Sequence, residues 1–127
     1  MGLQERRRIK VLQDEVVPEV KTQILELCGK DIEWEVVWDS FKDMTALDYI
    51  EYQGIRRVGD VFRGICYDEM GKEAVRDGVQ KIFIQNYESA DDVKVVFEKG
   101  VLEVHGAWGV GTYPREDDIK TLLEKGL

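Results

Sequence analysis

Two alternating segments on either side of Lys99 and Gly100 limit the possible fold more than any other feature of the sequence. Residues 92–98 and 101–105 each place apolar side chains at every second position, which is the pattern of a β-strand with one buried face. Only two residues, one of them glycine, separate the segments. Such a short connection predicts a β-hairpin.

The register of this hairpin follows from the same pattern. Pairing Glu98 with Val101 collects the apolar side chains on one face and places Lys94 opposite His105 on the other face. A slip of one residue would bury the charges, so the register is strongly specified. His105 is therefore expected to face solvent. Glu103 lies two residues away on the same face, a spacing too common to indicate a catalytic dyad.

The first part of the chain has the periodicity of a helix. Apolar residues recur every three or four positions, which marks one helix face: Ile9, Leu12, Val16, Val20, Ile24 and Leu27. Pro18 removes a backbone donor and disfavours helix at Val17. We predict one long kinked helix over residues 3–28, with two helices broken at Val17 as the alternative. Gly29 is a suitable residue for the helix end.

The middle of the chain mixes strand and helix signals. Ile32, Trp34, Val36 and Trp38 alternate as in a half-buried strand, and the two tryptophans are either core residues or an aromatic platform for a ligand. Helical patterns follow at residues 43–54, 55–70 and 72–78, and residues 81–87 alternate again. Pro114 and the acidic residues after it predict the start of a closing helix.

These elements predict one α+β domain over residues 1–127. We expect a two-layer arrangement with a four-stranded, largely antiparallel sheet, covered by helices on one face, and a long N-terminal helix. In this arrangement a strand and helices precede a three-stranded meander. The strand order does not follow from the pattern.

The charge of the chain constrains its partners. The net charge of −8 opposes binding to a phosphate backbone, so nucleic acid is an unlikely partner. The basic residues near the start, Arg6, Arg7, Arg8 and Lys10, form a local exception. At a helix N-terminus they oppose the helix dipole unless acidic groups lie nearby, and a second copy of the chain is one possible source of such groups.

The cellular location of the protein is predicted from three features. No apolar run is long enough for a membrane span, so no membrane association is expected. The first ten residues include positive charge but no apolar stretch, which predicts no secretory signal. Cys28 and Cys66 lie on apolar helix stripes and are interpreted as free buried thiols in a reducing compartment. The predicted location is the cytoplasm.

No motif for cofactor or metal chemistry is present in the sequence. The single histidine and two widely separated cysteines do not have the spacing of a zinc site. Gly106, Gly109 and Gly111 reverse the spacing of a dinucleotide-binding loop, and acidic residues follow them where a phosphate would bind. We therefore expect no cofactor, no metal site and no catalytic residue, although distant carboxylates could still converge in the fold.

The sequence favours a small non-catalytic protein-interaction domain with an acidic surface, such as an adaptor, an inhibitor or an immunity-type protein. Its partner would be another protein or a second copy of the chain. A small-molecule-binding domain with an aromatic pocket is one alternative, and an enzyme whose site assembles only in the fold is the other. The candidate binding residues are Arg6, Arg7, Arg8, Trp34, Trp38, Arg56, Arg63, His105 and Trp108.

Overall fold

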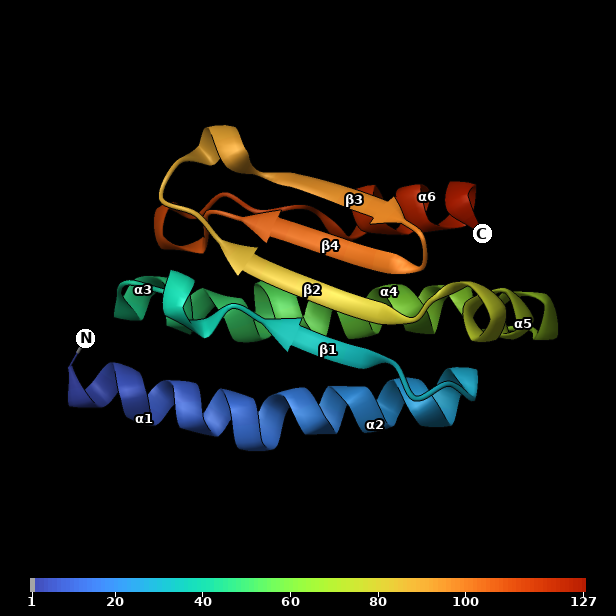
Figure 1. Ribbon diagram of the computed structural model, residues 1–127, viewed down its shortest axis with the longest axis horizontal. Helices are drawn as coiled ribbons and strands as arrows, with labels where there is room; N and C mark the ends of the chain where they lie inside the picture. Colours follow the sequence, from blue (N-terminus) through green and yellow to red (C-terminus); the bar gives the residue numbers. More distant parts are fainter. Residues whose placement is uncertain (1) are drawn as a thin grey trace.

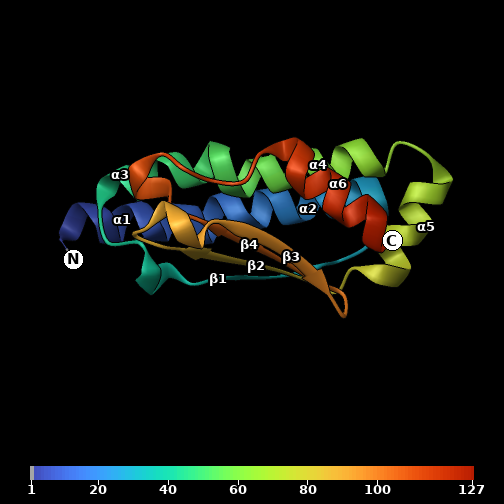
Figure 2. The same cartoon turned by 90° about the horizontal axis from the view of Figure 1, so that it is seen from above.

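The computed structural model describes residues 2–127 and has the predicted α+β architecture. A four-stranded sheet forms one layer, and the helices lie on one side of it (Figures 1 and 2). Within residues 2–127, none of the α-helices lies over the opposite face of the sheet (Figure 2). The expected two-layer arrangement with helices on one face is confirmed.

The N-terminal helix is long and continuous. It consists of α1 (Leu3–Val11), a π-helical turn η1 (Leu12–Val16) and α2 (Val17–Cys28), which confirms the prediction of one long helix over Pro18. The widened turn lies directly before this proline, which cannot donate to the carbonyl four residues earlier, so the hydrogen-bond ladder shifts there. Gly29 ends the helix in a left-handed conformation with φ 74°.

A second long helix runs through the middle of the chain. It comprises α3 (Met44–Ile50), a π-helical turn η3 (Glu51–Ile55) and α4 (Arg56–Ile65). Asp43 caps its start, because the side chain accepts a hydrogen bond of 2.8 Å from the amide of Ala46. The break expected at Gly54 is instead a widened turn within one continuous helix.

Two shorter helices complete the helical layer. Helix α5 (Glu69–Gly78) is capped by Asp68, and α6 (Glu116–Gly126) closes the chain. The closing helix begins two residues later than Pro114 suggested, and Arg115 occupies its N-cap. Among residues 2–127, none of the helices combines the length and apolar character needed to cross a membrane.

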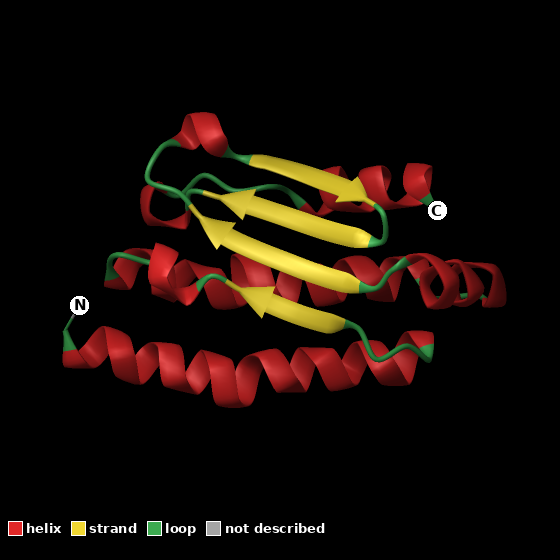
Figure 3. Ribbon diagram, viewed as in Figure 1, coloured by secondary structure: helices red, strands yellow, loops and turns green. Residues whose placement is uncertain are grey.

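The sheet contains β1 (Glu33–Val36), β2 (Lys81–Asn86), β3 (Lys94–Glu98) and β4 (Val101–Gly106) in the order β1-β2-β4-β3 (Figure 3). β1 pairs with β2 and β2 with β4 in parallel, and only β3 and β4 are antiparallel. The sheet is therefore mixed, and the prediction of a largely antiparallel meander is wrong.

The two hairpin strands explain why the sheet is mixed rather than an antiparallel meander. Leu102 and Val104 of β4 are fully buried, whereas Lys94 and Glu98 at the ends of β3 are exposed. A more apolar strand is more stable in a central position, and a charged strand suits an edge. The chain therefore crosses from β2 to the far edge, and the hairpin brings β4 back beside β2.

The predicted hairpin register is confirmed. Glu98 pairs with Val101, and Lys94 pairs with His105. Lys99 and Gly100 both have positive φ, 51° and 79°, as a two-residue turn between twisted strands requires.

The structure corrects the interpretation of the cysteines. Cys28 at the end of α2 and Cys66 after α4 form a disulfide with a Cα–Cα distance of 5.4 Å. Both are buried, as expected from the apolar stripes. They are not free thiols, because those two stripes pack against each other and bring the sulfur atoms together.

Candidate functional site

The strongest candidate site is a groove between the N-terminal helix and the edge of the sheet. It consists of two adjoining depressions of about 770 Å³ and 340 Å³, which share Gln13 and Trp38. We call it the tryptophan groove and define it by all the residues that line the two depressions: Arg6, Ile9, Gln13, Val17, Trp34, Glu35, Val36, Trp38, Asp39 and Lys42.

The helical wall of the groove follows from residue spacing. Ile9, Gln13 and Val17 are four residues apart, so they lie along one side of the long helix. Leu12 and Val16 point instead into the core, where they are buried. The same helix therefore packs against the core with one side and borders the groove with a neighbouring side.

The opposite wall is the outer edge of β1. Trp34, Glu35 and Val36 are consecutive, and all three line the groove. Side chains alternate between the two faces of a strand. A depression that contacts three consecutive residues must therefore lie at the strand edge, where it also borders the backbone.

The two groove tryptophans occupy different local structures. The strand ends at Val36, so Trp38 starts a short 3₁₀ turn, η2 (Trp38–Ser40), rather than continuing the strand face. Trp34 and Trp38 are half-buried and pack against the core. The indole Nε1 of Trp34 is buried and has no hydrogen-bond acceptor within residues 2–127. Both indoles are therefore core residues that also present a surface to the groove.

Charge is unevenly distributed along the groove. Arg6 and Lys42 lie near Asp39 at one end, and the exposed Arg7 adjoins Arg6 on the same helix. Glu35 lies in the other depression, where Lys81 pairs with its carboxylate at 2.5 Å. The end that contains Arg6 and Lys42 is thus the more positive one.

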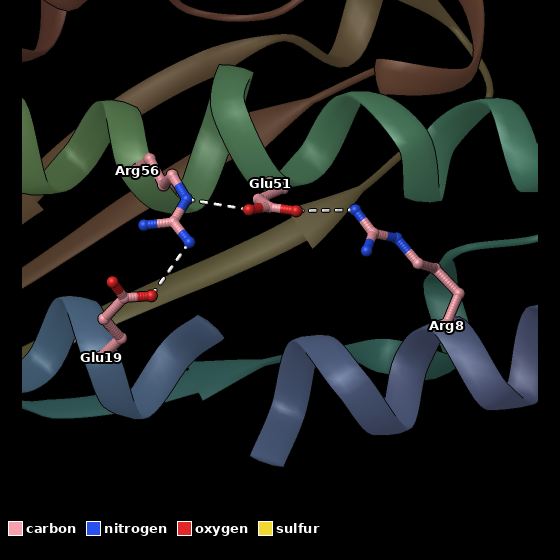
Figure 4. Close-up of polar contacts among 4 residues, drawn as sticks. All are labelled: Arg8, Glu19, Glu51 and Arg56. Atoms are coloured by element: carbon pink, nitrogen blue, oxygen red, sulfur yellow. Dashed lines mark hydrogen bonds and ion pairs between the residues drawn. The ribbon is translucent and has the colours of Figure 1, made fainter. Parts of the chain in front are cut away.

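Arg8 and Arg56 are not part of the groove, because both are bound to Glu51 (Figure 4). Arg8 donates to one oxygen of the Glu51 carboxylate at 2.8 Å, and Arg56 donates to the other at 2.9 Å. Arg56 also pairs with Glu19 at 3.0 Å. The network joins the N-terminal helix to the second long helix, so Arg8 finds its acidic partner within the same chain.

The network sets the protonation of Glu51. Burial of this carboxylate alone would raise its pKa and is the largest single influence. The hydrogen bonds from Arg56 and Arg8, together with their positive charges, outweigh burial and lower the pKa of Glu51 below its ordinary value. Glu51 is therefore a stable anion between two cations, which is a structural role.

Trp108 lies in the core. Its side chain is fully buried, and its Nε1 donates a hydrogen bond of 3.0 Å to the carbonyl oxygen of Gln53. The ring lies against Gly54, where an added Cβ would come within 3.2 Å of it. Trp108, a candidate binding residue in the sequence, therefore does not line the groove.

His105 is buried, so its predicted exposure to solvent is also wrong. Its Nε2 lies 2.8 Å from the carboxylate of Glu103, and its Nδ1 lies 2.9 Å from the hydroxyl of Tyr87. The side chain does lie on the face of the hairpin opposite the core, as the register requires. Phe83 and Tyr87 lie over it, with ring centroids 5.8 and 5.5 Å away. Burial, with the charges of Asp92 and Glu103, raises the pKa of Tyr87.

The remaining candidate, Arg63, is exposed on α4 and does not line the groove. The structure thus brings Arg6, Trp34 and Trp38 together in the groove. Arg7 adjoins Arg6 on the same helix, but neither it nor the other predicted residues line the groove. Sequence reasoning missed the other residues that line the groove: Ile9, Gln13, Val17, Glu35, Val36, Asp39 and Lys42. The spacing of Ile9, Gln13 and Val17 was visible, but Ile9 was assigned to the core stripe.

Within residues 2–127, no group of three or more His, Cys, Asp or Glu side chains is arranged to hold a metal ion. The geometry instead provides aromatic surface, a strand edge and charged groups at one end. Comparison of the chain with protein-family models, with curated proteins and with solved structures found no match.

Proposed function

We propose that this chain is a protein-binding domain and that the tryptophan groove is its binding surface. The observation that carries the proposal is the position of two half-buried indoles in a groove along a strand edge. Tryptophan and arginine are the side chains most enriched among residues that dominate binding energy at protein interfaces. Trp34, Trp38 and Arg6 supply both types.

The shape of the groove favours a protein over a small molecule. Small-molecule sites are concave and enclose most of the ligand surface. The tryptophan groove consists of two adjoining depressions along an elongated path from Arg6 to Trp34. A long site of this kind suits a polypeptide segment.

The charge of the chain indicates which charges its partner carries. The body is acidic, with a net charge of −8, and Arg6 and Lys42 place positive charge at one end of the groove. A partner with an acidic group at this end and basic groups around it would complement both regions. An adaptor, inhibitor or immunity-type role is consistent with such a partner.

Free thiols were one of the three features that predicted a cytoplasmic location, and the Cys28–Cys66 disulfide removes that one. Acid quenching of intact cells followed by alkylation of thiols under denaturing conditions, which expose the buried cysteines, tests the location. Modification of both cysteines would indicate a reducing compartment, and protection of both would indicate an oxidising one.

Photo-crosslinking tests the proposed function. Gln13 is exposed in the groove, and Lys125 is exposed on α6 outside it. We expect p-benzoylphenylalanine at position 13 to give discrete protein adducts in the native cell, and the same group at position 125 to give none of these. Adding Trp38→Ala should remove the adducts. Equal labelling from both positions, or adducts that persist with Trp38→Ala, would contradict the proposal.

A further inference from the structure

We infer that the partner binds as an extended peptide segment that adds a fifth strand to the free edge of β1. An apolar side chain of the segment contacts Trp34 and Trp38, and an acidic side chain lies toward Arg6 and Lys42. This inference rests on the proposed function and specifies the conformation and chemistry of the partner.

The hydrogen bonds of β1 identify the free edge. β1 lies at one end of the strand order, so β2 is the only strand that pairs with it in the described part of the chain. The amides of Glu33 and Val37 donate to the β2 side, to Gln80 and Ile84 at 3.2 and 2.9 Å. Because the groups of a parallel strand alternate between its two edges, the N–H and C=O of Trp34 and Val36 point to the opposite edge.

The free edge is short and has defined ends. The Lys21 ammonium donates to the carbonyl of Ile32 at 2.8 Å and so covers the edge immediately before Glu33. At the other end the strand gives way to the turn that begins at Trp38. Lysine side chains commonly protect strand edges in this way. The stretch from Trp34 to Val36 lies between these two ends and borders the groove.

The groove provides places for the side chains of an added strand. Alternate residues of such a strand would point toward the helical side, where Val17 and Trp34 supply apolar surface. Main-chain bonds to the edge give affinity in this binding mode, and pockets for alternate side chains give specificity. Arg6 and Lys42 then select an acidic residue near one end of the segment.

Charge argues against a second copy of β1 as the added strand. Glu33 and Glu35 both lie on the face of β1 that carries no helix. Pairing β1 with another β1 would gather the glutamates of both copies on one face, and like charges at such positions are destabilising. A segment with basic or neutral residues at these positions avoids this repulsion.

Selection from a peptide library provides the test. We would display random peptides of about ten residues, long enough to extend past β1 at both ends, and select them against the full chain. We expect selected peptides to combine an aromatic or aliphatic residue with an acidic residue. Trp38→Ala should abolish their binding. Arg6→Glu with Lys42→Glu should weaken it, whereas the exposed control Arg63→Glu should not.

Backbone substitutions then test strand addition itself. Val36→Pro removes an amide donor that faces the free edge and leaves the bonds to β2. We expect it to lower affinity by at least about tenfold. Val36→Ala keeps the donor and should have a smaller effect. If the proline variant fails to fold, N-methylation of the peptide replaces it: methyl groups on alternate amides should abolish binding, and methyl groups on the intervening amides should not.

Hydrogen exchange separates the possible outcomes. On binding, the amides of Trp34 and Val36 should become protected, whereas the amide of Lys125 should not change. Peptides could bind in a Trp38-dependent way while these amides stay unprotected and both alternate sets of N-methyl groups affect binding equally. In that case strand addition is wrong and the proposed function stands. If no selected peptide depends on Trp38, strand addition is also wrong, and the crosslinking from position 13 decides the proposed function.

Discussion

The indole Nε1 of Trp108 donates its hydrogen bond to the carbonyl of Gln53, a residue within the π-helical turn η3. A widened turn interrupts the regular i to i−4 ladder and so leaves a carbonyl available to a side chain. The turn and the buried tryptophan thus satisfy each other's polar groups.

This relationship predicts losses of stability of different size at two tryptophans. Trp108→Phe should lower the free energy of unfolding by about 2–4 kcal/mol, because it leaves the Gln53 carbonyl unpaired and opens a small cavity. Trp34→Phe should cost less than about 1 kcal/mol, because the Trp34 N–H has no acceptor within residues 2–127. Urea unfolding of both variants provides the measurement. Similar losses at the two positions would contradict this account.

His105→Ala should lower the free energy of unfolding by about 1–3 kcal/mol. The substitution removes a buried side chain and leaves the Tyr87 hydroxyl and the Glu103 carboxylate without their shared partner. Lys94 pairs with His105 in the hairpin but is exposed, so Lys94→Ala is the matched control and should stay within about 0.5 kcal/mol. Equal stability of His105→Ala and wild type would show that the histidine is not part of a buried network.

Glu51→Gln should reduce stability at neutral pH and flatten the acid limb of the stability curve. The pKa of Glu51 is lowered in the folded state, so its contribution is present above the unfolded pKa of about 4.3 and is lost as pH falls through the folded pKa. Loss of the two charged hydrogen bonds should cost about 1.5–3 kcal/mol at pH 7.

The measurement is the urea midpoint from pH 7 down to pH 3. The difference between wild type and Glu51→Gln should shrink as pH falls below the unfolded pKa and then through the lowered folded pKa of Glu51, where the folded carboxylate is protonated. Glu26 is exposed and makes no ion pair among the described residues, so Glu26→Gln should follow the wild-type curve. A constant difference at every pH would show that the charge of Glu51 is not responsible.

Replacing Cys28 and Cys66 together by serine should lower the free energy of unfolding by about 3–4 kcal/mol. The disulfide links residues 38 positions apart, and a loop of this length restricts the unfolded chain by about that amount. Reduction of the wild-type protein should have a similar effect on the unfolding midpoint. A midpoint that does not respond to reductant would contradict the disulfide.

Local elements of this fold were predictable from sequence, and distant pairings were not. The hairpin register depends on alternation and a two-residue turn, so all its information lies within residues 94–105. The parallel pairing of β2 with β4 depends on which strand is better buried in the whole sheet. That choice has no local signal, so a meander was the simpler expectation.

The candidate site also depends on tertiary contacts that local sequence patterns do not predict. Alternation correctly placed His105 on the side of the strand opposite the core, but whether that side is covered depends on Tyr87, which is brought there by the connection after β2. The apolar stripes placed both cysteines inward, but their distance depends on the packing of two helices. Trp34, Trp38 and Arg6 were identified by residue type, whereas Gln13 and Lys42 belong to the groove only because of the tertiary arrangement.

The position of β4 between β2 and β3 also imposes an order in time on folding. The hairpin can form within about 1–10 μs because its contacts are local. β2 can pair with β1 beforehand, but its pairing with β4 must wait for the hairpin to dock, because β4 is the last strand in the chain. We therefore expect substitutions at Val95 and Val104 to slow folding, and substitutions at Ile82 to act more on the unfolding rate. The sheet then forms when two preformed strand pairs dock: β1 with β2, and the hairpin of β3 and β4.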